Sequence, residues 1–204
     1  MTEQQVKQRS AGIAQNFYNR FKPYDEAVCY AMGDVYQIPV RPATKREDTY
    51  RHIDFFFNSP YRQRDYGVDV KNEKRFTRRD DHYDYKGTRV EMKNVNGKKG
   101  WICGDEDYVG FTTPTGLYCV NREDLLQLVL SHLGDAPVSS VISDKPYSKY
   151  QRKGDGRDDY TVYVPMRDIV KLRHFYLPVD AYGIKKKLNL LDSDCEHGFS
   201  EDTE

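Results

Sequence analysis

The chain has 204 residues, enough to bury the core of one domain but too few for two large domains. Its 32 basic and 32 acidic side chains cancel, so the net charge does not indicate a surface that attracts nucleic acid everywhere. No apolar run approaches the roughly 20 residues of a membrane span, and the polar first five residues do not resemble a secretory signal. We therefore expect a folded cytoplasmic protein that does not contact a membrane.

Hydrophobic residues make up only 38% of the chain, but 17 Tyr and 9 Phe can each bury a large area and offset the shortage of aliphatic side chains. The cysteines contain no C-x-x-C pair, which disfavours a zinc knuckle or a dense disulfide framework and indicates a reducing compartment. They are Cys29, Cys103, Cys119 and Cys195.

Apolar residues recur at helical spacing through residues 3–37 and are interrupted at Pro23, which predicts a helical extension over residues 1–22 followed by a second helix. Residues 51–120 then alternate apolar and polar side chains between turn sequences, which predicts an antiparallel meander. Its expected strands are residues 51–57, 66–71, 88–94, 107–112 and 116–120.

The C-terminal half predicts an amphipathic helix from Arg122 to Leu133, with Asn121 as its cap, then a polar loop over residues 143–158. A strand at 160–164 and a short helix after Pro165 follow. Residues 183–204 are basic and then acidic, which predicts a disordered tail. Residues 23–182 would thus form one mixed α/β domain, with helices flanking a central sheet.

The segment around Asp69 carries the most informative chemistry. In a strand, Val68 and Val70 would enter a core while Asp69 and Lys71 project together from the other face. If Asp54 comes from the neighbouring strand, two carboxylates and one ammonium meet. Two close carboxylates repel each other unless a cation lies between them, so this set predicts Mg²⁺ or Mn²⁺ and a water directed at a phosphodiester. An exposed cross-strand salt bridge is the simpler alternative.

A second copy of the pattern leaves an alternative open. Glu91 and Lys93 also share one face of a predicted strand, which we expect beside the strand of Asp69. Glu91 either completes the metal site, or Asp69 is the first acid and Glu91-x-Lys93 is the working motif. We prefer the first arrangement because Gly67 permits a close approach of backbone or ligand near Asp69.

The segment from Tyr147 to Arg157 interleaves tyrosines with basic residues, as a loop that contacts a nucleic-acid strand would. Trp101 is better explained as a core or rim aromatic than as a base-stacking platform. The residues predicted to contact phosphates are Lys93, Lys149, Arg152, Lys153 and Arg157.

Other chemistries lack their sequence patterns. The five histidines show no H-x-x-x-H or H-x-H spacing, which leaves a histidine metal site without support. The chain contains no P-loop, no G-x-G-x-x-G and no G-x-S-x-G, which disfavours nucleotide-driven chemistry, dinucleotide binding and a serine esterase.

With Asp54, Asp69 and Lys71, the chain resembles the PD-(D/E)xK nuclease superfamily, whose fold is called restriction-endonuclease-like, over roughly residues 26–168. The resemblance implies a helix, which can donate an acid such as Glu26, before a meander that carries D and then (D/E)xK. Ile53 stands where the family signature has proline. The run from Val90 through Trp101 to Phe111 is similar to bacteriophage members of the group.

The resemblance implies a metal-dependent nuclease that acts on DNA and is encoded by a phage, with Asp54, Asp69, Glu91 and the carbonyl of Val70 as ligands of Mg²⁺ or Mn²⁺. Lys71 would orient the attacking water. Homodimers are common in this superfamily, although nothing in the sequence marks an interface. Two alternatives stay open: an inactive nuclease fold that binds nucleic acid or a host defence protein, and an assembly protein that uses its acidic tail.

Overall fold

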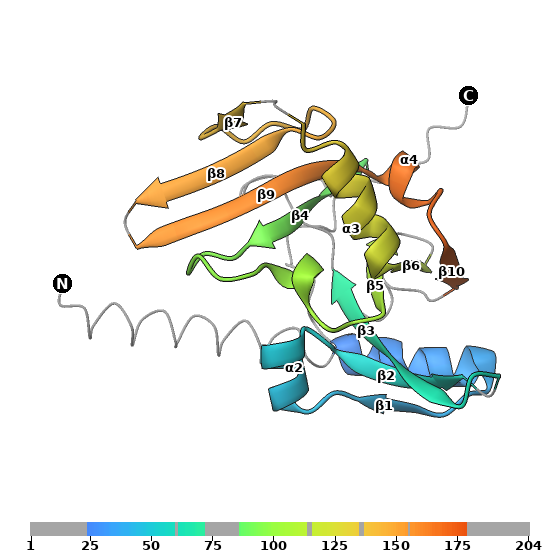
Figure 1. Cartoon of the computed structure of the whole chain (residues 1–204). Helices are drawn as coiled ribbons and strands as arrows, with labels where there is room; N and C mark the ends of the chain where they lie inside the picture. The colour runs from blue at the N-terminus through green and yellow to red at the C-terminus, as the bar shows by residue number, and fades with distance from the viewer. Residues whose placement is uncertain are drawn as a thin grey trace, which may run out of the picture.

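The computed structural model describes residues 24–59, 61–71, 86–113, 116–134, 137–154 and 156–178. The predicted N-terminal extension and acidic tail lie outside these residues. The described part is a mixed α/β structure, as the sequence predicts, and it has two sheets and few helices (Figure 1).

The larger sheet has six strands in the order β1-β2-β3-β5-β6-β10. Neighbouring strands are antiparallel except β3 and β5, which are parallel. The strands are β1 (Val40–Pro42), β2 (Phe55–Ser59), β3 (Arg64–Lys71), β5 (Tyr108–Thr113), β6 (Gly116–Asn121) and β10 (His174–Leu177). Four of the five strands predicted for the meander therefore lie in one sheet, whereas β1 and β10 fall in segments without a strand prediction.

The smaller sheet has the order β4-β9-β8-β7, and it corrects the prediction of a single meander. Its strands are β4 (Gly87–Lys93), β9 (Arg157–Pro165), β8 (Lys149–Gly154) and β7 (Val138–Ser139). β4 does not pair with β3 or β5, its neighbours in sequence. It pairs with β9 along its whole length. The predicted loop over residues 143–158 contains β8, a strand whose one apolar residue, Tyr150, is too little to form a period-2 pattern.

Helices connect and cover the sheets. A helix occupies residues 24–36, and the short helices are α2 (Lys45–Arg51), the 3-10 turn η1 (Trp101–Cys103), α3 (Arg122–Ser131) and α4 (Met166–Ile169). The cap prediction for α3 is confirmed, because the Asn121 side chain accepts a hydrogen bond from the backbone of Asp124. α2 replaces the predicted start of a strand at residue 51, so β2 begins later, at Phe55.

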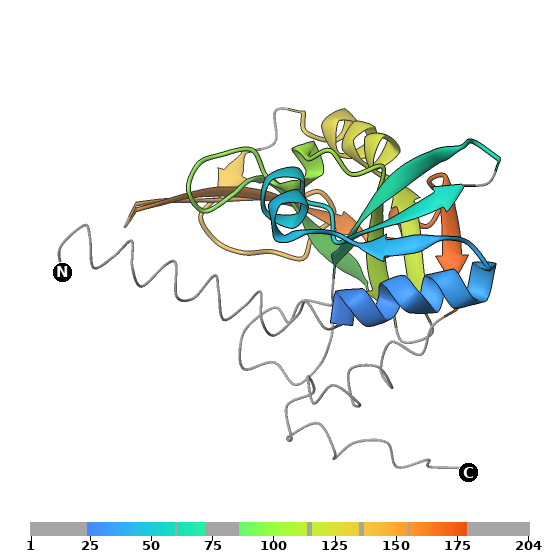
Figure 2. The same ribbon diagram turned by 90° about the horizontal axis from the view of Figure 1, so that it is seen from below.

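Two hydrophobic cores lie on opposite faces of the larger sheet. The helix at residues 24–36 runs across one face (Figure 2), where Val28 and Met32 pack against Val68 and Val70 of β3. On the other face, α3, η1 and the smaller sheet share a core that includes Val109 of β5. Asp69 is paired in register with Val109. The face that carries Asp69 is therefore the one turned toward η1 and the smaller sheet.

Among the described residues, Cys29, Cys103 and Cys119 are free thiols. Among the described residues, no helix combines the length and the apolar composition that crossing a bilayer requires.

Candidate functional site

The turn between α2 and β2 brings Asp54 opposite Asp69. α2 ends at His52, whose φ of 55° is left-handed and redirects the chain into β2. Asp54 then donates its backbone N–H to the carbonyl of Val68, at 2.8 Å, and Phe55 pairs with Val68 in the antiparallel register. Asp54 precedes the paired residues of β2, and its carboxyl group shares a hydrogen bond with the carboxyl group of Asp69.

The side chains of this pair meet Lys71. The ammonium nitrogen of Lys71 lies 2.6 Å from Oδ2 of Asp69, and Oδ2 of Asp54 accepts a 2.6 Å hydrogen bond from the backbone of Val70. The Lys71 ammonium also lies 4.9 Å from the ring centre of Trp101. The structure thus brings together the predicted Asp54, Asp69 and Lys71, and Trp101 borders them as a buried aromatic of the core.

Burial dominates the electrostatics of the pair. Asp54 and Asp69 are 8% and 3% exposed. Burial and the charge of Asp69 raise the pKa of Asp54 to about 7, and burial also raises the pKa of Asp69. Burial lowers the pKa of Lys71, but the charges of Asp69 and Asp54 outweigh it, so that pKa lies above its usual value. One ammonium therefore does not fully balance the two carboxyl groups.

A further acid, Glu106, lies within electrostatic range of this group and is absent from the sequence predictions. Glu106 is 2% exposed. Burial and the charge of Asp69 raise its pKa to about 9. Its neighbours Asp105 and Asp107 are also acidic, and nothing in the sequence distinguishes the buried acid from the other two. We refer to Asp54, Asp69, Lys71 and Glu106 as the acid cluster.

Glu91 does not occupy the predicted strand beside Asp69, because β4 pairs with β9 in the smaller sheet. The charge of Glu91 raises the pKa of His52, next to the acid cluster. The Lys93 ammonium lies 2.8 Å from Asp158, so this lysine is engaged away from Asp69. The Asp69-x-Lys71 motif has a second acid, Asp54, in contact with its carboxyl group.

Glu26 belongs to the helix at residues 24–36, which covers the sheet face that carries Val68 and Val70. Asp69 and Lys71 project from the opposite face. His52 lies closer to the acid cluster: burial and the charge of Lys71 lower its pKa, so that it favours the neutral ring.

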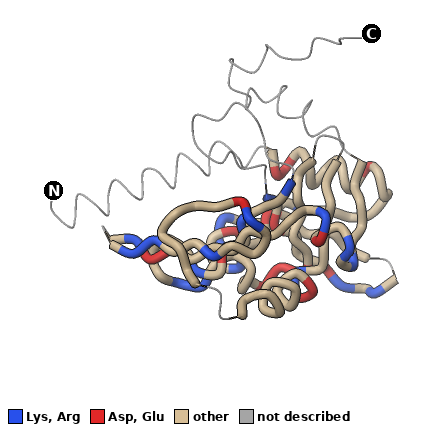
Figure 3. Tube along the Cα trace, turned by 90° about the horizontal axis from the view of Figure 1, so that it is seen from above, with Lys and Arg blue, Asp and Glu red and all other residues tan. Residues whose placement is uncertain are grey.

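Four of the five predicted phosphate contacts lie on the hairpin of β8 and β9 rather than on a loop, and Lys93 lies on β4. Arg152 pairs with Asp159 at 2.9 Å, and the Lys149 ammonium donates to the carbonyl of Gly134 at 2.7 Å. Together with Lys93, these residues thus make contacts within the protein, whereas Lys153 and Arg157 are exposed near the hairpin turn. Basic and acidic residues are interspersed along this hairpin (Figure 3).

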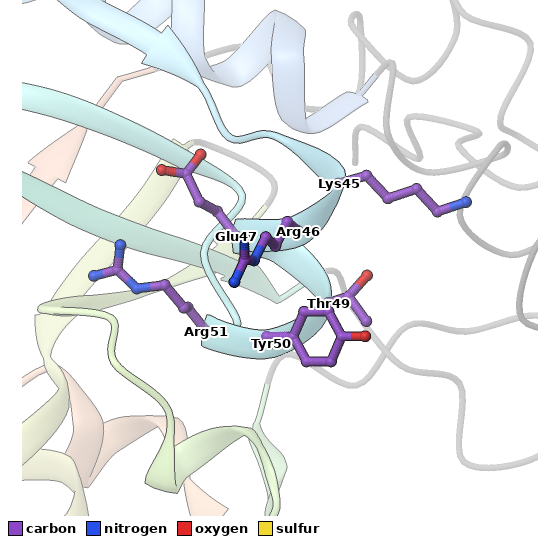
Figure 4. A pocket seen from close by; sticks show the side chains of 6 residues that line it. All are labelled: Lys45, Arg46, Glu47, Thr49, Tyr50 and Arg51. Carbon is purple, nitrogen blue, oxygen red and sulfur yellow. The ribbon is translucent and has the colours of Figure 1, made fainter.

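A surface hollow lies on α2, just before the chain enters the acid cluster (Figure 4). Lys45 and Arg51 extend to opposite sides of the helix there, and the Tyr50 ring is 78% exposed. The hollow is lined by Lys45, Arg46, Glu47, Thr49, Tyr50 and Arg51. Three of these six side chains are basic, which fits a surface that contacts an anion, but none of them belongs to the acid cluster.

The acid cluster fits a hard divalent cation in the type of its ligands, because all of its acidic donors are carboxylate oxygens. Within the described residues, no three His, Cys, Asp or Glu side chains converge closely enough to hold an ion by themselves. A cation at Asp54 and Asp69 would therefore need further oxygen ligands, such as backbone carbonyls or water, which Mg²⁺ accepts readily.

Comparisons with known proteins give no independent assignment: no protein-family model, curated protein or solved structure matches the chain.

Proposed function

We propose that the protein is a metal-dependent nuclease with a restriction-endonuclease-like core, which hydrolyses phosphodiester bonds of DNA. The observation that carries the proposal is the contact between the carboxyl groups of Asp54 and Asp69, with the Lys71 ammonium 2.6 Å from Asp69. Two carboxylates and one ammonium from adjoining strands are the chemical minimum for holding a divalent cation beside a phosphate.

The order of elements supports the same proposal. The helix at residues 24–36 precedes the antiparallel strands β1, β2 and β3. Asp54 stands directly before β2, and Asp69-x-Lys71 ends β3. This arrangement is what the resemblance to the PD-(D/E)xK superfamily implies: a helix, then a meander that carries first D and then the D-x-K motif.

Each residue of the motif would have a separate role. Asp54 and Asp69 would hold Mg²⁺ or Mn²⁺, with the carbonyl of Val70 as a further oxygen ligand. When bound, the ion lowers the pKa of a water and stabilises charge on the phosphate. The Lys71 side chain is 20% exposed, against 5% for Asp69, so it is the group that an approaching phosphate would meet. Lys71 would orient the water and stabilise the developing negative charge.

The nucleic acid would extend from Lys71 onto basic surface residues. Lys153 and Arg157 near the hairpin turn are exposed. Arg46, which lines the hollow on α2, lies nearer to Asp54 in the sequence than Lys153 and Arg157 do. These cations would hold the backbone phosphates without reading the base sequence.

A cleavage assay tests the proposal. Circular single-stranded, linear duplex and branched DNA are each incubated with the protein in Mg²⁺, in Mn²⁺ and in EDTA. We expect cleavage of at least one substrate with a divalent ion and none in EDTA, and we expect Asp69→Ala to abolish it without unfolding the protein. Cleavage by Asp69→Ala at the wild-type rate would refute the assignment.

The deep burial of the two carboxyl groups favours a second candidate, an inactive nuclease fold that binds nucleic acid or a host defence protein. Asp69 is only 3% exposed, so a substrate atom has little access to it in this conformation. A binding protein need not take up a cation, whereas a nuclease must. Calorimetric titration with Mg²⁺ or Mn²⁺ therefore separates the two candidates.

A further inference from the structure

Glu106 is held inside the protein without the contacts that a buried acid normally makes. Among the residues that the structure describes, neither of its carboxylate oxygens has a hydrogen-bond partner outside Glu106 itself. An isolated charged or polar group away from water is costly, and a buried group without a partner calls for a ligand, a water or an ion. Glu106 is therefore either kept neutral by its surroundings or completed by something that binds there.

The backbone around Glu106 leaves room for its carboxyl group next to the α2–β2 turn. The loop is fixed because Asp105 donates its backbone N–H to the carbonyl of Arg51, at 3.0 Å. A Cβ atom at Gly104 would lie 2.2 Å from Oε2 of Glu106 and 3.1 Å from Cβ of His52. Any side chain at residue 104 would thus displace the carboxyl group from the turn that leads to Asp54.

The carboxyl group of Glu106 interacts electrostatically with other members of the acid cluster. Asp69 raises the pKa of Glu106 and Lys71 lowers it, so the carboxyl group senses both residues. Arg122 acts on Glu106 as well, but its guanidinium donates to the backbone carbonyls of Glu106 and Ile102, at 3.1 and 3.4 Å. When its three acids and Lys71 are all ionised, the acid cluster carries two negative charges in excess, which one divalent cation would neutralise.

We propose that Glu106 is the third acid of the cation site, which it contacts through a water of the hydration shell of the ion. The water-mediated contact agrees with the geometry, since the three acids do not converge on one point, and with the tendency of Mg²⁺ to keep several of its waters. Such partners orient the ligands and commonly affect metal affinity by about 10- to 100-fold. This inference deepens the proposed function and rests on it.

Calorimetric titration of Mn²⁺ into the full-length protein tests the inference, using wild type, Glu106→Gln and Asp105→Asn. Glu106→Gln keeps the shape of the side chain and removes its charge. Asp105→Asn removes the neighbouring acid, whose side chain is 65% exposed and pairs with Arg51, so it controls for a general loss of negative charge. We expect Glu106→Gln to weaken Mn²⁺ binding by about 10- to 100-fold and Asp105→Asn to change it by less than a factor of about three.

The outcomes separate the inference from the proposed function. If wild type binds Mn²⁺ and Glu106→Gln binds it equally well, Glu106 is a neutral structural acid and only the inference fails. If wild type takes up no Mn²⁺, the proposed function fails and the inference fails with it. Gly104→Ala is the second variant, in case Glu106→Gln does not fold: it keeps the charge of Glu106 but displaces the carboxyl group, and it should weaken Mn²⁺ binding in the same direction.

Discussion

The acid cluster and the β8–β9 hairpin contain the same types of charged residue in opposite arrangements. At the hairpin, the acids pair with partly exposed basic side chains, as in Arg152–Asp159 within the hairpin and Lys93–Asp158 between β4 and β9, and the further bases Lys153 and Arg157 are exposed. In the acid cluster, three buried acids share the ammonium of Lys71. Matched surface pairs contribute little and need no ligand, whereas a buried excess of like charge persists only if a cation or protons offset it. The unbalanced region is therefore the one that we expect to perform chemistry.

The largest expected effect comes from removing one acid of the pair. Asp69→Asn keeps the side-chain shape but removes a proposed ligand, so we expect the rate of Mg²⁺-dependent DNA cleavage to fall by more than about 100-fold, beyond the usual cost of an outer-sphere partner. Asp159→Asn, on the hairpin, is the matched control and should retain the wild-type rate. An equal loss of cleavage rate in both variants would contradict the proposed difference between the acid cluster and the hairpin.

Substituting Lys71 should separate binding of the ion from catalysis. Lys71→Met removes the ammonium while keeping the length of the side chain, so we expect a rate loss of at least about 100-fold with Mn²⁺ affinity unchanged or higher, because a positive charge has left the site. Single-turnover cleavage and calorimetry measure the two quantities. Lys93→Met is the matched control, and a loss of Mn²⁺ affinity in Lys71→Met alone would show that the lysine organises the site rather than assisting the reaction.

The pH dependence of stability should reveal Glu106 in the absence of divalent ions. The folded protein holds the proton of Glu106 up to a pKa of about 9, whereas the unfolded chain releases it near 4.5. The stabilisation is thus complete below pH 4.5 and is lost as the pH rises through 9, with a slope of up to about 1.4 kcal/mol per pH unit. Urea unfolding in EDTA from pH 5 to pH 9 should show this slope in wild type and a shallower one in Glu106→Gln. Parallel curves would mean that Glu106 titrates normally.

The smallest effect is expected on the hairpin. A double-mutant cycle of Arg152→Met and Asp159→Asn should give a coupling free energy of about 0.2–1 kcal/mol, because the Arg152 side chain is 39% exposed and water screens the pair. Urea unfolding at low and high salt measures it, with a smaller value expected at high salt. A coupling of several kcal/mol would show that the hairpin pairs are as consequential as the acid cluster.

Local patterns in the sequence predicted the strands that carry the chemistry. The alternation around Asp69 placed Val68 and Val70 in a core and Asp69 and Lys71 on the other face, because a strand has a fixed period of two residues. The close approach expected at Gly67 is made by a side chain rather than by a backbone or a ligand, because a Cβ at Gly67 would lie 2.8 Å from the side chain of Ile53. These features depend only on neighbours in sequence or on one hairpin.

Long-range pairing could not be read from the same patterns. β4 has the alternation of any half-buried strand, and nothing in that pattern says that its partner is β9, some 70 residues later, rather than β3. This is why Glu91 was expected beside Asp69. β8 escaped prediction because its charged residues are satisfied by cross-strand partners, and Glu106 because the burial of an acid depends on the tertiary fold.

The most direct test of the cation site is anomalous diffraction from crystals of the protein soaked in Mn²⁺. We predict one strong anomalous peak within about 2.6 Å of a carboxylate oxygen of Asp54 and of Asp69, and its loss in Asp69→Asn. A wild-type map with no peak between these two carboxyl groups, at a Mn²⁺ concentration that supports DNA cleavage, would contradict the account.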